Sequence, residues 1–298
     1  MAPAVHTPAG AVRYAVSGPP ASGRPDLVLV HGWCCESSSM ATLKQAFAGD
    51  HRILEIDLRG HGESSRVEDD GSMGVGGIRM ADMGEPVPRA LRDVRIEDYA
   101  DDVWQVCRKA LAQTPVLVGH SMGALVVLAA LAAHHTGPQA PIGGVLLDPA
   151  PVVDPSGKAF WQEAAVEVAG DHSGTWRTRF AEGLFLSTDR VARHAVIETM
   201  ARFRPAVAAG AARAVADFDG ETALRRVETP LLVIHADTAE RQIGEVARDA
   251  GVALTEGQTV GAGHFHHLEV PEQVVPMIAR WLQVRDLDAH MDVAGPHG

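Results

Sequence analysis

The most constraining feature of the sequence is a five-residue motif, Gly-His-Ser-Met-Gly at residues 119–123, which stands between two apolar runs. The run before it, 115–118, has the length of a buried strand, and the run after it, 124–131, is long enough for a buried helix. A serine on so tight a turn adopts a strained backbone conformation. Glycines two residues to either side let the strand and the helix approach without a Cβ clash. The motif therefore predicts that Ser121 is lifted clear of a sheet, where a base and a substrate carbonyl can both reach it.

The rest of the chain alternates predicted strands and helices. Apolar runs and alternating patterns predict strands at 12–16, 26–31, 53–57, 115–118, 142–148, 230–235 and 252–255. Helical spacing predicts helices at 96–111, 124–133, 239–249 and 271–284. Several of the strands are continuous apolar runs, as expected for a parallel sheet that is covered on both faces. The predicted fold class is α/β, with one discontinuous core over residues 1–149 and 223–284.

Three segments depart from this pattern. Residues 67–92 have no sustained period, which indicates a lid-like or disordered loop. Residues 150–222 lose the strand pattern and hold seven of the fourteen aromatic residues (Trp, Tyr and Phe), which predicts a helical cap. The tail at 285–298 is polar and contains Gly and Pro, so we expect it to be flexible.

Charge and composition exclude several classes of function. The net charge is −12 and no run of Lys and Arg exceeds two residues, which argues against binding of nucleic acid or of an anionic membrane. No signal peptide is visible at the N-terminus, and the three cysteines form no disulfide framework, so a cytoplasmic location is expected. No CxxC or HExxH pattern occurs, and we expect neither a metal nor an organic cofactor. The oligomeric state stays open, since an apolar lid and a homodimer interface give the same pattern.

Four segments in sequence order carry a family resemblance: His31-Gly32-Trp33, the segment 57–62, the motif at 119–123, and Gly261-Ala262-Gly263-His264. Together they resemble the α/β-hydrolase fold family over roughly residues 10–284. The resemblance implies a mostly parallel eight-stranded sheet with helices on both faces and a helical cap after strand 6. It also implies that Ser121 is the nucleophile and His264 the general base, because serine attacks only when an imidazole removes its proton.

The same resemblance implies an oxyanion hole. Its two donors are the backbone N–H groups of Trp33 and Met122. Each lowers the activation barrier by roughly 3 kcal/mol when it points at the attacked carbonyl oxygen. Two other histidines, His266 and His267, compete with His264, but only His264 follows the Gly-x-Gly turn. We expect His266 and His267 to form a surface pair where the next helix begins.

The carboxylate that would orient His264 is where the sequence departs from the family. Most members place it in a Gly-x-x-Asp turn after the seventh strand, and the equivalent position here is Ala239. Three candidates remain: Asp148 after the sixth strand, Asp237, and Glu240. Asp237 and Glu240 also match a D-x-x-E capping box, and Asp148 also fits a turn before proline. Asp148 is the first choice and Asp237 the alternative.

A serine at position 121 limits the classes of reaction that such a site can catalyse. Members of the family that attack carbon by displacement, such as haloalkane dehalogenases, use an aspartate there. Serine fits attack on the carbonyl of an ester or lactone, through an acyl-enzyme. A C–C bond hydrolase, a perhydrolase-like enzyme or an acyltransferase would use the same residues, and a non-catalytic small-molecule receptor is the alternative from another class. Aromatic residues of the cap predict a pocket for an apolar substrate or, alternatively, the cap's own core; the pocket candidates are Trp161, Trp176, Phe180 and Phe185.

Overall fold

The computed structural model describes residues 2–7, 10–19, 24–65, 87–111, 113–134, 136–137, 139–151, 154–237 and 242–293. Most of the predicted loop at 67–92 lies outside the described residues, and only its end is seen, as the short helix α2 (Arg89–Arg92). Glu240 also lies outside them, as do residues 294–298 of the predicted tail.

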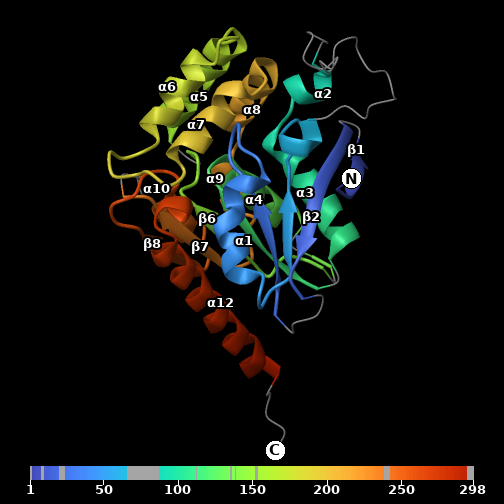
Figure 1. The fold of residues 1–298 in the computed structure, drawn as a ribbon. Helices are drawn as coiled ribbons and strands as arrows, with labels where there is room; N and C mark the ends of the chain where they lie inside the picture. Colours follow the sequence, from blue (N-terminus) through green and yellow to red (C-terminus); the bar gives the residue numbers. More distant parts are fainter. Residues whose placement is uncertain are drawn as a thin grey trace, which may run out of the picture.

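An eight-stranded sheet forms the centre of the molecule (Figure 1). Its strands are β1 (Ala4–Thr7), β2 (Gly10–Ser17), β3 (Asp26–Val30), β4 (Ile53–Ile56), β5 (Pro115–His120), β6 (Gly143–Leu147), β7 (Leu231–His235) and β8 (Leu254–Gln258). Their order is β1-β2-β4-β3-β5-β6-β7-β8. The pairs β1–β2 and β2–β4 are antiparallel and the other pairs are parallel, so the predicted mostly parallel sheet is confirmed.

Helices cover both faces of the sheet because alternate residues of each strand point to opposite sides. In β3, Leu27 and Leu29 pack in an apolar cluster with α1 (Ala41–Phe47) and α12 (Pro271–Val293). Val28 and Val30, on the other face, pack in a second cluster with residues of α3 (Ile96–Ala110) and α4 (Met122–Ala133). Every residue of β3 is buried, which explains the continuous apolar run from Leu27 to Val30.

A group of helices separates β6 from β7 in the chain. It contains α5 (Pro155–Ala169), α6 (Thr175–Gly183), α7 (Arg193–Arg202), α8 (Pro205–Asp217) and the short α9 (Gly220–Leu224). We call α5 to α8 the inserted helices. They pack as two pairs, α5 against α8 and α6 against α7, and lie together at one end of the molecule (Figure 1). This is the end at which the parallel strands finish, since residues that follow β5 and β6 share a cavity with residues of α5 and α6.

Two elements near the C-terminus differ from the prediction. The strand expected at 252–255 is β8 at Leu254–Gln258, an edge strand whose mixed polar residues gave no apolar run. The last helix, expected to end at 284, continues as α12 to Val293, because no Gly or Pro interrupts the chain between residue 284 and that point. Figure 1 shows this end of α12 projecting from the body of the molecule. Among the described residues, no helix has both the length and the apolar character needed to cross a membrane.

Candidate active site

Ser121 lies on the turn between β5 and α4, in a conformation that few residues other than glycine adopt. Its φ is 54° and its ψ is −118°. Backbone strain of this kind costs about 1–3 kcal/mol and concentrates at functional sites. The flanking glycines are required by close packing: a Cβ on Gly119 would lie 2.2 Å from the Gly123 oxygen, and a Cβ on Gly123 would lie 2.3 Å from the Val30 oxygen. The turn is tied to the neighbouring strand because the Ser121 N–H donates to the Leu147 carbonyl at 3.0 Å.

His264 and Asp148 are hydrogen-bonded to each other. The distance from His264 Nδ1 to Asp148 Oδ2 is 2.5 Å, and the other carboxylate oxygen accepts the N–H of Ala236 at 3.0 Å. Burial by itself would raise the pKa of Asp148, but the hydrogen bond and charge of His264, with the Ala236 N–H, hold that pKa below its usual value. Since an ionised carboxylate only accepts, Nδ1 carries the hydrogen and Nε2 is the free acceptor of the neutral ring.

Asp237, the alternative acid, does not contact this histidine ring. Its carboxylate accepts the N–H of Gly261 at 3.1 Å, and its own N–H donates to the Ala262 carbonyl at 3.2 Å. Asp237 therefore holds the backbone of the loop that leads to His264. Of the three acid candidates, the structure brings only Asp148 to the imidazole among the residues that it describes.

The loop that carries His264 is also held by the segment that follows α6. The His264 N–H donates to the Leu184 carbonyl at 2.9 Å, and the Gly263 N–H donates to the buried carboxylate of Asp189 at 3.0 Å. The same carboxylate accepts the Leu186 N–H at 2.7 Å. A Cβ on Gly263 would lie 2.5 Å from the Leu184 oxygen, so this contact requires glycine. Sequence reasoning missed Asp189, because no pattern marks a partner 74 residues away.

The prediction that His266 and His267 lie at the surface is wrong. Both are fully buried, because α11 (His266–Glu269) packs against α1, α12 and the segment Ser37–Met40 instead of lying on the surface. Burial lowers the pKa of His266 to about 4 and that of His267 to about 3. His267 Nε2 donates to the Ser39 carbonyl at 3.0 Å, and its ring lies 4.4 Å from that of His120. His120 in turn donates from Nε2 to the His264 carbonyl at 3.0 Å, and burial lowers the pKa of His120 well below its usual value. Two neutral histidines in contact, His267 and His120, therefore hold the backbone of His264 in place.

The backbone next to Ser121 offers two N–H groups. Gly32 approaches so closely that a Cβ on it would lie 3.2 Å from the Ser121 Cβ. His31 shapes this loop, since its Nδ1 donates to the Gly32 carbonyl at 2.9 Å. Within the described part of the chain, neither the Trp33 N–H nor the Met122 N–H donates a hydrogen bond to a protein group. Met122 is also the first residue of α4, where backbone N–H groups have no partner inside the helix.

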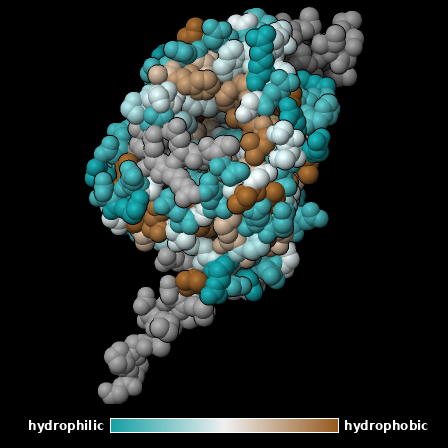
Figure 2. Space-filling view, turned by 90° about the vertical axis from the view of Figure 1, so that its left-hand side faces the viewer, coloured by the Kyte–Doolittle hydropathy of each residue, from teal (hydrophilic) through white to brown (hydrophobic). Residues whose placement is uncertain are grey.

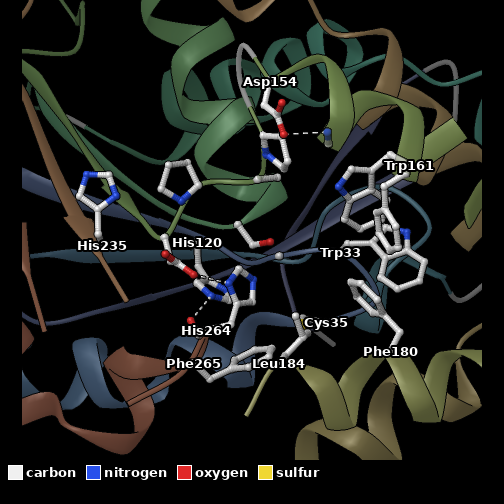
Figure 3. A pocket seen from close by; sticks show the side chains of 18 of the residues that line it. Trp33, Cys35, His120, Asp154, Trp161, Phe180, Leu184, His235, His264 and Phe265 are labelled. Atoms are coloured by element: carbon white, nitrogen blue, oxygen red, sulfur yellow. Dashed lines mark hydrogen bonds and ion pairs between the residues drawn. The ribbon is translucent and has the colours of Figure 1, made fainter. Parts of the chain in front are cut away.

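A cavity of about 470 Å³ joins these residues to the inserted helices. Its lining includes Ser121, His264 and Asp148. Figure 3 shows His264 among the side chains that line it. The aromatic side chains in the lining are Trp33, Phe160, Trp161, Phe180 and Phe265, together with His120 and His235. Figure 2 shows a mostly polar face on which hydrophobic side chains form several separate patches, one of them at the level of the inserted helices.

The four predicted pocket residues fall into two pairs. Trp161 and Phe180 line the cavity. Trp176 and Phe185 are not among the described residues that line it: Trp176 stacks on Phe180 with ring centroids 5.4 Å apart, and Phe185 stacks on Phe265 at 5.2 Å. The sequence did not point to Cys35, Asp154 or His235, which also line the cavity. No group of three or more His, Cys, Asp or Glu side chains within the described ranges is arranged to hold a metal ion.

A profile of the alpha/beta hydrolase family matches residues 27–277, most of the chain, and the protein belongs to this family. Comparison with curated proteins found no match.

Solved structures share the fold at low identity. An enol-lactonase from Burkholderia xenovorans LB400 has a TM-score of 0.75 and 18% identity, covering 94% of this chain and 100% of its own. A thermophilic esterase from Thermogutta terrifontis has a TM-score of 0.73 and 21% identity, with 95% and 98% covered. A bromoperoxidase from Bacillus anthracis has a TM-score of 0.71 and 18% identity, with 92% and 95% covered.

Proposed function

We propose that this protein is a serine hydrolase that cleaves an ester or lactone of an apolar small molecule through an acyl-enzyme. The observation that carries the proposal is the arrangement around one cavity: Ser121 on a strained turn, and His264 with its Nδ1 bonded to the ionised Asp148. A nucleophile, a base and a carboxylate that orients the base are the parts of a catalytic triad. The similarity to an esterase and to an enol-lactonase supports the choice of an acyl bond.

The first half of the reaction forms the acyl-enzyme. His264 Nε2 accepts the hydroxyl proton of Ser121 as Oγ bonds to the substrate carbonyl carbon. Negative charge on the carbonyl oxygen is stabilised by the N–H groups of Trp33 and Met122. When the tetrahedral intermediate collapses, the bond to the leaving oxygen breaks and that oxygen takes the proton from His264.

The second half of the reaction returns the free enzyme. Water gives a proton to His264 Nε2 and its oxygen attacks the acyl carbon, after which the Ser121 oxygen leaves with that proton. Asp148 stays ionised throughout and stabilises the imidazolium. The inserted helices act as the cap of the site, because Trp161 of α5 and Phe180 of α6 close the cavity above Ser121.

Labelling with a fluorophosphonate probe tests the nucleophile. The wild-type protein is expected to gain one probe adduct by intact-mass measurement and to show a burst with p-nitrophenyl butyrate. Ser121→Ala should lose both. Ser38→Ala is the matched control, since Ser38 is exposed and, among the described residues, its hydroxyl bonds to the nearby Glu36 carboxylate alone. Labelling that survives Ser121→Ala, or no labelling of the wild type, contradicts the proposal.

A further inference from the structure

The cavity has an aromatic side, formed by Trp33, Trp161 and Phe180. In Figure 3 these three side chains lie together on one side of His264, and His235 lies on the other. The aromatic side is built from separate parts of the chain: the loop after β3, α5 and α6. Cys35 adds a thiol on the same loop, and burial raises the pKa of that thiol to about 12, so it stays protonated and uncharged.

The three rings form a packed wall in which each meets the next edge to face. Trp33 and Trp161 have ring centroids 5.3 Å apart at 75°, and Trp33 and Phe180 are 5.4 Å apart at 89°. Trp161 and Phe180 are 5.6 Å apart at 69°. Trp33 is only 3% exposed, and its indole N–H donates to the Ala208 carbonyl at 2.9 Å, so the polar atom of this ring is already paired. A ligand group that enters here meets ring surfaces and no free donor from Trp33.

The charges on the lining favour an aromatic ring over a cation as the occupant. Among the described lining residues the carboxylates are Asp148 and Asp154. Asp148 is paired with His264, and Asp154 caps the start of α5 by accepting the N–H groups of Ser156 and Gly157. Both carboxylates are thus hydrogen-bonded to other groups, and neither bonds to a residue of the aromatic side. Aromatic pairs in edge-to-face or offset geometry gain more than area burial alone provides.

The position of Trp33 decides which half of the substrate lies at the aromatic side. Its backbone N–H is a proposed donor to the carbonyl oxygen, and its ring belongs to the wall. An ester carbonyl carbon carries two groups, the acyl chain and the leaving oxygen, and the one that points away from His264 lies beside this ring. The leaving oxygen must instead face His264, from which it takes its proton, and the rest of the leaving group continues away from the wall.

We propose, on the basis of the proposed function, that the acyl group of the substrate carries an aromatic ring that binds against the wall formed by Trp33, Trp161 and Phe180. The substrates are esters of arylalkyl carboxylic acids, and the alcohol part contributes less to recognition. A benzyl-sized group fits a cavity of about 470 Å³ together with the ester and a small alcohol.

A comparison of two constitutional isomers tests whether the aromatic ring binds on the acyl side or on the alcohol side. Methyl phenylacetate carries the ring on the acyl side, and benzyl acetate carries it on the alcohol side. Each kcat/KM is measured by titration of released acid and divided by the rate constant of alkaline hydrolysis of the same ester. We expect methyl phenylacetate to be preferred by about tenfold or more, the scale on which an apolar pocket discriminates. Methyl cyclohexylacetate, which has no π face, should be poorer than methyl phenylacetate by about threefold to tenfold.

A substitution in the aromatic wall provides a second test of the proposal. Trp161→Leu should lower kcat/KM for methyl phenylacetate by about tenfold more than it lowers kcat/KM for methyl acetate. Trp104→Leu is the matched control, because Trp104 stacks on His134 and is not among the described residues of the cavity. It should change neither substrate.

The outcomes distinguish this inference from the proposed function. Equal rates for the two isomers, a preference for benzyl acetate, or a Trp161→Leu variant that loses both substrates alike would overturn the acyl-side aromatic site, even with Ser121 still labelled by fluorophosphonate. Loss of that labelling instead counts against the nucleophile itself.

Discussion

Replacing Asp148 with asparagine is expected to abolish most of the activity although the new side chain fills the same space. In the wild type, one carboxylate oxygen accepts the Ala236 N–H at 3.0 Å and the other lies 2.5 Å from His264 Nδ1. An asparagine keeps the first bond only if its amide oxygen faces Ala236. Its NH₂ group then faces His264, whose Nδ1 must become the acceptor. The ring hydrogen moves to Nε2, which can no longer take the proton of Ser121.

The size of the effect follows from this exchange of tautomers. Where an asparagine replaces the orienting aspartate of a triad, kcat falls by about 10⁴. At about 1.4 kcal/mol per factor of ten, this corresponds to an increase of about 5.5 kcal/mol in the activation barrier. Asp237→Asn is the matched control. It keeps an oxygen that accepts the Gly261 N–H, so kcat should stay within about threefold of the wild type.

The assay is kcat on p-nitrophenyl butyrate for both variants, with thermal unfolding to show that each is folded. The reasoning is refuted if a folded Asp148→Asn variant keeps more than about a tenth of the wild-type kcat. It is refuted equally if Asp237→Asn loses as much as Asp148→Asn.

Three further predictions concern the surroundings of the site. Gly263→Ala should lower kcat by about 10² or more, since a Cβ 2.5 Å from the Leu184 oxygen must displace the loop of His264; an unchanged kcat contradicts this contact. Asp189→Ala leaves two backbone N–H groups without their acceptor and should reduce the free energy of unfolding in urea by about 2–4 kcal/mol; equal stability would show that water replaces the carboxylate. Burial lowers the pKa of His266 to about 4 and of His267 to about 3, whereas the unfolded chain binds these protons near pH 6.5. The unfolded state therefore binds more protons below pH 6.5, and the free energy of unfolding should fall by up to about 1.4 kcal/mol per pH unit for each histidine as the pH drops. Urea unfolding at pH 7.5 and 5.5 measures the slope, and a His267→Gln variant with the full wild-type slope would argue against this source.

The folding pattern could be predicted from the sequence because its causes are local. A strand buried on both faces is apolar along most of its length, as β3 is from Leu27 to Val30, and a helix on a turn as tight as that of Ser121 needs glycine on both sides. Where the local signal was weak the predicted bounds were wrong: β8 begins two residues later than predicted and includes exposed polar residues, and α12 continues past 284. The mostly parallel sheet with helices on both faces was confirmed on these grounds.

The sequence by itself determined the turn at Ser121, the parallel sheet and the histidine that follows the Gly-x-Gly turn. Only the tertiary structure decided which carboxylate meets that histidine, because Asp148 and His264 are 116 residues apart and meet where the chain leaves β6 and β8. It also decided that His266 and His267 are buried, since a short polar helix can lie on the surface or under a site with the same sequence pattern. Short-range packing leaves a mark on neighbouring residues, whereas a contact between distant segments depends on how the sheet brings their ends together.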